Sequence, residues 1–234
     1  MILLHGTNSW AREMLVLAEY MRPYEKKAFM PNLLGHGGRP VPERLTIADF
    51  ARDVVAYMDE QGIARDIVAG FSTGGYVSLY LARHYPDRVV GAIAMGTKFA
   101  YDEETVKHFT YLVSLERLGQ PGHPRVPQYL LNHHPQDWRE ISARNGDLFR
   151  ALGRKPEVTE EDLRAISVPV LLVSGENDAV VPAKESRAMK DLIPRCDLML
   201  VRGPSHPLPA MPLDIVCAAI AVWMAKVRKE AAPA

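Results

Sequence analysis

The sequence has few cysteines and no excess of charge of either sign. Only two of the 234 residues are cysteine, Cys196 and Cys217, and neither belongs to a CxxC motif. Two cysteines are too few for a disulfide framework, so we expect free thiols in a reducing compartment. The 28 basic residues equal the 28 acidic residues in number. This balance offers no electrostatic basis for binding nucleic acid or an anionic membrane surface, and it suits a small, neutral or weakly charged substrate.

Long hydrophobic runs, internal repeats and a leader pattern are also missing. The longest apolar run, Ile215–Met224, has about half of the roughly 20 residues that a membrane span needs. The chain does not open with a basic stretch followed by an apolar one, so we expect no signal peptide. With 47% hydrophobic and 24% charged residues, the composition is that of an ordinary soluble protein. We therefore expect a cytoplasmic protein without a membrane partner.

What the sequence does contain is an alternation of short apolar runs with stretches of helical spacing. The apolar runs predict strands, and the spaced stretches predict helices that cover them. Near-continuous apolar strands of this kind are typical of an α/β fold with a mostly parallel sheet that is buried on both faces. The predicted strands are 1–4, 27–30, 67–69, 89–95, 168–174 and 198–201, and the predicted helices are 10–21, 46–58, 75–85, 183–192 and 213–227.

The stretch 101–166 breaks this alternation. It contains helical segments and loops but no convincing strand, and it is too long for an ordinary connection. We interpret it as a helical lid over the active-site end of the sheet. The predicted core then consists of residues 1–100 and 167–234.

The segment Gly70–Gly75 has the pattern G-x-S-x-G, with Ser72 at its centre. It follows a predicted strand and precedes a predicted helix, which is the structural context of a nucleophile elbow. Glycine is needed at positions 70 and 74 because side chains would collide where the strand and the helix approach each other. The helix N-terminus behind Ser72 places positive potential under a developing anion. Taken alone, this pattern also fits a glycine-rich turn in any α/β protein.

A second short motif, His5-Gly6-Thr7, ends the first predicted strand. Glycine at position 6 lets the backbone approach a substrate, and the N–H groups of Thr7 and Thr73 can act together as oxyanion donors. We place His5, Gly6, Thr7 and Thr73 in the oxyanion and substrate-binding region. The alternative interpretation of His5-Gly6 is a simple turn at the end of a strand.

A carboxylate and a histidine follow the last two predicted strands. Asp178 comes after the strand 168–174, where a carboxylate can accept a hydrogen bond from histidine Nδ1 and fix its tautomer. Glu176 is the reserve candidate for this role. His206 lies in a loop between the last predicted strand and the last predicted helix. The order Ser72, Asp178, His206 is the order in which α/β-hydrolases place their nucleophile, acid and base.

Other acidic and histidine residues are weaker candidates for these roles. Asp147 and Asp162 fall in the predicted lid, where we expect them to be solvated. His36 lies in a glycine-rich loop and is interpreted as a residue that shapes this loop. The remaining histidines at helix or lid positions are expected to be exposed, namely His84, His108, His133 and His134.

Together these motifs resemble the α/β-hydrolase superfamily over nearly the whole chain. The stretches Leu3–Gly6 and Pro31–Gly37 add to the likeness. The sequence is most similar to the small, lid-bearing branch that holds esterases, lactonases, carbon–carbon bond hydrolases and the menaquinone-pathway lyase MenH. The resemblance implies the α/β-hydrolase fold, a triad of Ser72, His206 and Asp178, and neither a cofactor nor a metal.

The sequence departs from this family pattern in two places. Members have one or two strands before the His-Gly strand, whereas here Met1 lies almost inside that strand. We therefore expect a shortened N-terminal edge of the sheet, which leaves the oligomeric state open, a homo-oligomer included. The loop before Gly35 carries Asn32 where relatives often have Asp, so neutral hydrogen bonds are expected in place of an ion pair. Because the nucleophile is serine, the branches that form an aspartyl ester are disfavoured.

These observations predict a serine hydrolase that cleaves an ester or related acyl bond of a small substrate, as a carboxylesterase does. Two alternatives stay open, namely a carbon–carbon hydrolase or MenH-like lyase acting on a carboxylate substrate, and a ligand-binding receptor on the same fold. The predicted lid holds apolar side chains that either line the pocket or form the lid core, and basic ones that either meet a substrate carboxylate or are solvated. The apolar set is Phe109, Tyr111, Leu112, Leu115, Tyr129, Leu130, Trp138 and Phe149, and the basic set is Lys107, Arg117, Arg125, Arg139, Arg144, Arg150 and Arg154.

Overall fold

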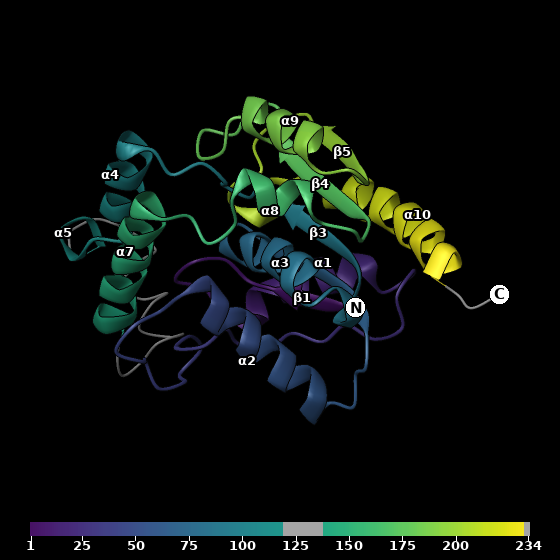
Figure 1. Ribbon diagram of the computed structural model, residues 1–234, viewed down its shortest axis with the longest axis horizontal. Helices are drawn as coiled ribbons and strands as arrows, with labels where there is room; N and C mark the ends of the chain where they lie inside the picture. Colours follow the sequence, from purple (N-terminus) through teal and green to yellow (C-terminus); the bar gives the residue numbers. More distant parts are fainter. Residues whose placement is uncertain (119–137, 232–234) are drawn as a thin grey trace.

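The core of the protein is one parallel sheet, seen in the computed structural model in Figure 1, which describes residues 1–118 and 138–231. In this part of the chain the sheet has five strands in the order β1-β2-β3-β4-β5, and every neighbouring pair is parallel. The predicted parallel α/β sheet is confirmed. The strands are β1 (Ile2–Leu4), β2 (Asp66–Phe71), β3 (Val89–Met95), β4 (Val170–Gly175) and β5 (Cys196–Val201).

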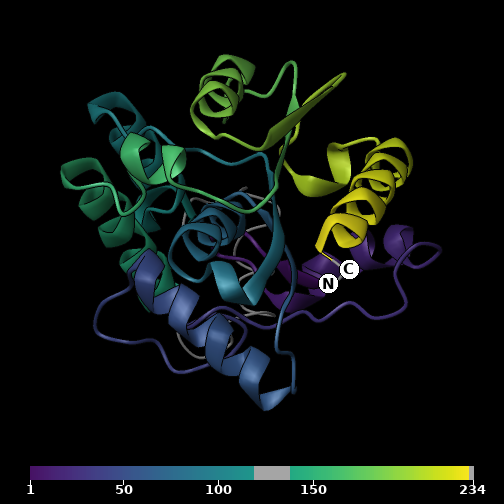
Figure 2. The same cartoon turned by 45° about the vertical axis from the view of Figure 1, so that its right-hand side comes forward.

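Helices cover both faces of the sheet, as Figures 1 and 2 show. One face carries α2 (Ile47–Glu60), α3 (Thr73–His84), α8 (Glu160–Arg164) and α9 (Ala183–Leu192). The other face carries α1 (Leu15–Met21) and α10 (Leu213–Ala231), which lie against each other. Among the described helices, none combines the length and apolar character that crossing a membrane requires. Short 3-10 turns occur at η1 (Ala11–Met14), η2 (Pro86–Arg88) and η3 (Leu208–Ala210).

Alternate side chains of each strand enter two separate hydrophobic cores. Along β3, Ala92 packs with the side chains of α2 and α3, and the next residue, Ile93, packs with those of α1 and α10. Successive strand residues point to opposite faces of a sheet, so a sheet that helices cover on both faces needs apolar residues at both odd and even strand positions. This requirement explains why these strands appear in the sequence as continuous apolar runs.

The segment between β3 and β4 is helical wherever the structure describes it. It contains α4 (Glu103–Leu112), α5 (Leu115–Leu118), α7 (Trp138–Arg154) and then α8, with no strand among its described residues. Figure 1 shows α4, α5 and α7 grouped beyond one end of the sheet. The rings of Phe109 on α4 and Phe149 on α7 meet edge to face, with centroids 5.3 Å apart. The predicted boundaries of a separate lid, 101 and 166, stay a prediction.

Two carboxylates fasten the ends of this helical segment to the rest of the fold. Where the chain leaves the sheet, Glu185 on α9 accepts hydrogen bonds from the backbone N–H groups of Phe99 and Ala100. Between α7 and α8, near the other end of the segment, Glu157 accepts from the N–H groups of Ile47 and Ala48, the first two residues of α2. The second contact supplies acceptors for N–H groups that have no partner inside the helix. Both ends of the segment are thus anchored by charged hydrogen bonds.

The predicted strand at 27–30 is not formed, and the structure reduces it to one bridge beside β1. Phe29 donates to the carbonyl of Met1 at 2.9 Å and accepts from the N–H of Leu3 at 2.8 Å. Beyond these two bonds the stretch has no further ladder, because no described strand lies on its far side. A strand is stabilised by repeated pairing, so an apolar run at the margin of a sheet does not guarantee one.

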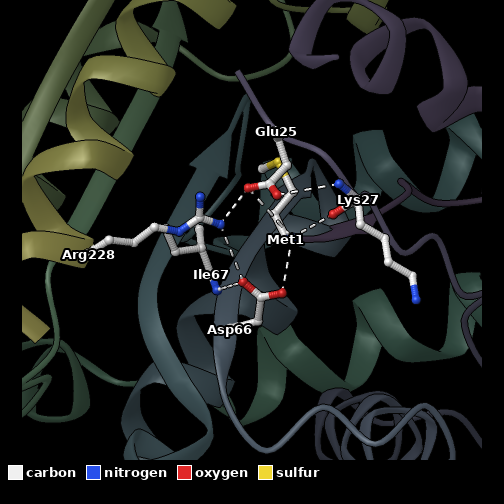
Figure 3. Close-up of polar contacts among 6 residues, drawn as sticks. All are labelled: Met1, Glu25, Lys27, Asp66, Ile67 and Arg228. Atoms are coloured by element: carbon white, nitrogen blue, oxygen red, sulfur yellow. Dashed lines mark hydrogen bonds and ion pairs between the residues drawn. The ribbon is translucent and has the colours of Figure 1, made fainter. Parts of the chain in front are cut away.

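A charged cluster joins the beginnings of β1 and β2 to α10, at the end of the sheet away from the carboxyl ends of the strands (Figure 3). The guanidinium of Arg228 bonds to the carboxylate of Glu25 and lies 3.7 Å from the carboxylate of Asp66. The amino group of Met1 lies 3.0 Å from Asp66 and donates to the carbonyl of Lys27. The cluster therefore ties α10 and the segment before Phe29 to the two strands.

Candidate active site

Ser72 lies in a strained turn between β2 and α3. Its backbone has φ 53° and ψ −116°, a conformation that side-chain-bearing residues rarely adopt. The glycines around it are required by close backbone contacts. A Cβ on Gly70 would lie 2.0 Å from the carbonyl oxygen of Gly74, and a Cβ on Gly74 would lie 2.4 Å from the carbonyl oxygen of Leu4. The turn has the form of a nucleophile elbow, with the serine at the carboxyl end of the strand.

Substituting Gly70 by alanine is expected to destabilise the protein by about 3 kcal/mol, because the new Cβ would meet rigid backbone rather than a movable side chain. Gly146 on α7 is the matched control, since a Cβ there has no atom closer than 3.6 Å. Gly146→Ala is expected to raise stability by about 0.5–1 kcal/mol, because glycine disfavours a helix interior. Urea unfolding of both variants measures the difference. Equal stability of the two variants would contradict the steric account.

Asp178 follows β4 and is held by five hydrogen bonds. Its Oδ1 accepts from the N–H groups of Val180 and Val181 at 2.7 and 2.8 Å. Its Oδ2 accepts from the N–H of Ser205 at 2.8 Å, from the hydroxyl of Ser205 and from Nδ1 of His206. Burial on its own raises the pKa of this carboxyl, but the hydrogen bonds from His206, Ser205 and Val181 outweigh burial and hold the pKa well below its ordinary value. Both oxygens of the Asp178 carboxylate therefore accept hydrogen bonds, which favour its charged form.

His206 follows β5 and meets Asp178 through one ring nitrogen. Nδ1 lies 2.9 Å from Oδ2 of Asp178, and the ring packs on Phe71, the residue before Ser72, with centroids 4.8 Å apart. The other ring nitrogen, Nε2, is buried and has no hydrogen-bond partner within the described residues. His206 and Ser72 line the same cavity, although no hydrogen bond joins the Ser72 hydroxyl to Nε2 in this structure. Such bonds are often long before a substrate binds, and Nε2 is the nitrogen available to take a proton.

Three of the four residues predicted for the oxyanion region lie next to Ser72, namely Gly6, Thr7 and Thr73. Gly6 and Thr7 line the cavity beside Ser72, and a Cβ on Gly6 would lie 3.4 Å from that of Ser72. The hydroxyl of Thr7 is hydrogen bonded to that of Thr73, the first residue of α3. The loop after β1 and the start of α3 are therefore directly joined next to the serine.

His5 does not line the cavity, contrary to its predicted place in the substrate-binding region. It is fully buried, its Nδ1 bonds to the carbonyl of Gly6 at 2.8 Å, and its Nε2 accepts from the N–H of Leu33 at 3.0 Å. Nδ1 therefore holds the loop after β1 in shape, and Nε2 joins this loop to the loop that follows the Phe29 bridge. The ring shapes the loop, and Gly6 and Thr7 face the cavity.

The weaker acidic candidates lie away from His206. Glu176, the reserve acid, is exposed to solvent. Asp162 caps α8 in a capping box with Thr159 and lies 3.2 Å from Arg83. Asp147 is exposed on α7 and bonds to Arg150. His36 is buried and donates from Nδ1 to the carbonyl of Leu34, in keeping with its predicted role in shaping its loop.

The cavity above Ser72 has a volume of about 350 Å³ and one apolar wall. The residues of this wall belong to the helical segment between β3 and β4. Of the apolar residues expected either to line the pocket or to form the lid core, Tyr111 and Leu115 are exposed, and Trp138 is buried outside the cavity lining. Tyr129, Leu130, Arg125, His133 and His134 fall outside the described residues. The wall consists of Phe109, Leu112, Val113, Leu118 and Phe149, and the polar lining of Thr7, Asn8, Ser9, Glu13 and Arg117.

Comparison with known proteins decides the family. Residues 1–219 match the model of a family described as the alpha/beta hydrolase family. The chain belongs to the alpha/beta hydrolase family. This match covers both parts of the sheet and the helical segment between them, so the fold and the hydrolase class hold for the chain as a whole.

Relatives of this alpha/beta hydrolase differ widely in the substrates for which they are named. RutD of Caulobacter sp. (strain K31), named for carbamate hydrolysis, is 26% identical over 84% of this chain and 78% of its own length. The 2-hydroxymuconate semialdehyde hydrolase of Pseudomonas putida is 26% identical over 74% of this chain and 68% of its own. A thermophilic esterase from Thermogutta terrifontis shares the fold, with a TM-score of 0.73 at 24% identity over 97% of this chain and 89% of its own.

Three residues of the site in this alpha/beta hydrolase have no signal in the sequence. Ser205 donates twice to Asp178, and the amide of Asn145 donates to Asn8, which lines the cavity. Serine and asparagine are common in loops, so their type and spacing alone do not mark them. Within residues 1–118 and 138–231, no group of three or more His, Cys, Asp or Glu side chains is placed to hold a metal ion.

Proposed function

We propose that this alpha/beta hydrolase is a serine hydrolase that cleaves an ester or related acyl bond of a small substrate, with Ser72 as nucleophile, His206 as general base and Asp178 as the group that orients the base. The observation that carries the proposal is the hydrogen bond from His206 Nδ1 to Asp178. It leaves Nε2 without a partner among the described residues, at a cavity that Ser72 also lines. Only a base that is held at one nitrogen and free at the other can relay a proton.

In the proposed mechanism, Nε2 of His206 takes the proton of Ser72 as the serine oxygen attacks the acyl carbon. Asp178 holds Nδ1 protonated and stabilises the imidazolium that forms. The N–H groups of Thr7 and Thr73 bind the oxyanion, because both adjoin the serine and the latter lies at a helix N-terminus. His206 then returns its proton to the leaving group and activates the water that hydrolyses the acyl-enzyme.

The walls of the cavity favour an uncharged acyl group of modest size. Five apolar side chains of the helical segment face Ser72 across a volume of about 350 Å³. A second cavity of about 570 Å³ adjoins it and offers room for a leaving group; the two cavities share Gly6, Ser9, Glu13, Phe71 and Pro207. A carboxylesterase-like activity on small esters fits this division of space.

The proposal is tested with p-nitrophenyl acetate and butyrate and with a fluorophosphonate probe. We expect turnover of both esters and labelling of Ser72 in a one-to-one ratio with protein. Labelling of Ser72 without turnover of any ester would instead support a ligand-binding receptor. Neither labelling nor turnover would contradict a nucleophilic Ser72 altogether.

One observation favours a second candidate, a carbon–carbon bond hydrolase or MenH-like lyase that acts on a carboxylate substrate. Arg117 on α5 lines the cavity, and its guanidinium bonds to the carbonyl of Leu112 but to no carboxylate in the described part of the chain. A cation without an acidic partner at a cavity is suited to bind a substrate carboxylate. Glu13 lines the same cavity, so its charge opposes this binding.

With a carboxylate-bearing substrate, Arg117→Gln is expected to raise KM about 10- to 100-fold, which is the effect of losing a hydrogen bond between charged groups. With p-nitrophenyl acetate the same substitution should change KM less than threefold. Arg139→Gln is the control, because Arg139 is exposed and stacks on Trp138 outside the cavity. Steady-state kinetics on both substrates decide between the candidates. An equal change in KM for the two substrates would rule out a carboxylate-binding role for Arg117.

A further inference from the structure

The buried face of α7 carries polar side chains where apolar ones would be expected. Ser142 and Asn145 are both fully buried, one helical turn apart, on the side of α7 that faces the loop after β1. Oδ1 of Asn145 has no hydrogen-bond partner in the part of the chain that the structure describes. A buried polar atom without a partner costs free energy, so stability alone does not account for an asparagine at this position.

The hydrogen bonds of Asn145 lead directly to the proposed oxyanion loop. Its Nδ2 donates to Oδ1 of Asn8 at 2.8 Å and lies 3.2 Å from Nε2 of His36. Nδ1 of His36 donates to the carbonyl of Leu34, so Nε2 is an acceptor and both hydrogens of the Asn145 amide are used. Nδ2 of Asn8 donates in turn to the hydroxyl of Ser142 at 3.1 Å. Turning the Asn145 amide over would place its oxygen against two acceptors, so the network fixes one orientation.

Asn8 needs such an anchor because its backbone is in the left-handed region, with φ 52°. This conformation is unfavourable for every residue that has a side chain, although asparagine tolerates it better than most. Asn8 lines the cavity and follows Thr7, whose N–H is the proposed oxyanion donor. The angle at Asn8 sets the direction in which the chain leaves Thr7, so loss of the anchor would move that N–H.

We infer that Asn145 is a positioning residue for the oxyanion loop, which it holds by locking Asn8 in its left-handed conformation. The helix that supplies Phe149 to the wall of the cavity thereby also fixes the donor that faces the reacting carbonyl. The inference rests on the proposed function, because it requires an oxyanion at Thr7. It assigns to α7 a part in the chemical step as well as in shaping the cavity.

The test is a double-mutant comparison on the full chain with p-nitrophenyl butyrate as substrate. Asn145→Ala is expected to lower kcat about 10- to 100-fold with less than a threefold change in KM, somewhat less than the roughly 100- to 1,000-fold effect of removing an oxyanion donor outright. In an Asn8→Gly background the same substitution should lower kcat less than threefold, because glycine adopts a positive φ without an anchor.

Leu152→Ala serves as the control for lost stability. Leu152 is buried on the same helix and lies outside the cavity lining, so its truncation should lower the Tm at least as much as Asn145→Ala while leaving kcat within threefold. An unchanged kcat in Asn145→Ala would overturn the inference, and so would an equal loss in the Asn8→Gly background. If Ser72→Ala is inactive, either of these results refutes only the role of Asn145. If Ser72→Ala is fully active, the proposed function itself is refuted.

Discussion

Replacing Ser72 by alanine is expected to lower kcat for p-nitrophenyl butyrate by about 10⁴- to 10⁶-fold, because the hydroxyl proposed to attack the acyl carbon is lost. The variant should fold normally, since alanine keeps the Cβ and the side chain of Ser72 makes no capping hydrogen bond to α3. KM should change little, because the cavity walls stay in place. Stopped assays with enough enzyme to detect residual turnover measure the effect.

Ser186→Ala is the matched control for this substitution. Ser186 is a buried serine on α9 that does not line the cavity, so its loss should leave kcat within threefold. The fluorophosphonate probe adds an independent measurement, since Ser72→Ala should lose all labelling and Ser186→Ala none. Turnover by Ser72→Ala at the level of the unmodified protein would end the serine-hydrolase proposal.

Under the proposed mechanism, Asp178→Asn is expected to lower kcat by about 10⁴-fold, which is the effect of losing the orienting acid of a Ser-His-Asp triad. The structure explains why the amide is a poor substitute. Oδ1 must accept from Val180 and Val181, so the amide nitrogen would occupy the place of Oδ2 and face three donors, one from His206 and two from Ser205. The imidazole would have to change its tautomer, which protonates Nε2 and removes the base.

Glu176→Gln tests the alternative acid in the same assay. Glu176 lies two residues away and is exposed, so its substitution should leave kcat within threefold. A loss of about 10⁴-fold in Glu176→Gln with normal activity in Asp178→Asn would reverse the assignment. Equal, small effects of both variants would mean that His206 needs no acid.

The depressed pKa of Asp178 also gives the Asp178→Asn variant a signature in stability. A carboxyl whose folded-state pKa lies below its unfolded value of about 4 stabilises the fold fully above that value. As the pH falls below 4, the Asp178 carboxyl binds a proton in the unfolded chain but not yet in the folded chain, and this stabilisation is lost. The free energy of unfolding should therefore fall more between pH 6 and pH 3 for the unmodified protein than for Asp178→Asn. Urea unfolding at the two pH values measures the difference, and equal falls would show that the hydrogen bonds do not favour the charged form.

Much of the fold and the principal candidate residues could be predicted from local patterns. The strand 89–95 is found at its predicted residues, and α2 begins at Ile47, one residue after the predicted start of the helix 46–58. Glycine occupies positions 70 and 74, where a Cβ would collide with the backbone at the close approach of strand and helix. These features depend on neighbours in the chain, and neighbours are what a sequence displays.

The errors arise where a feature depends on distant parts of the chain. The run 27–30 has the composition of a strand but too few pairing partners, and His5 lies next to the cavity in sequence but turns its ring between two loops. Tyr111 and Leu115 have the helical spacing of lining residues but lie on the exposed side. Periodicity gives the faces of a helix without stating which face meets the site.

The sequence by itself determined the parallel α/β sheet and the elbow at Ser72, because strand periodicity, glycine placement and the turn at a helix N-terminus are set by residues within a few positions of one another. Only the tertiary structure decided which carboxylate meets His206, that Ser205 completes the shell of Asp178, and that Asn145 reaches Asn8 across 137 positions of chain. Hydrogen bonds of this kind join atoms a few ångströms apart in space, but the two residues that they join have no fixed separation in the sequence. Their partners are therefore set by the packing of α7 and the loops against the sheet.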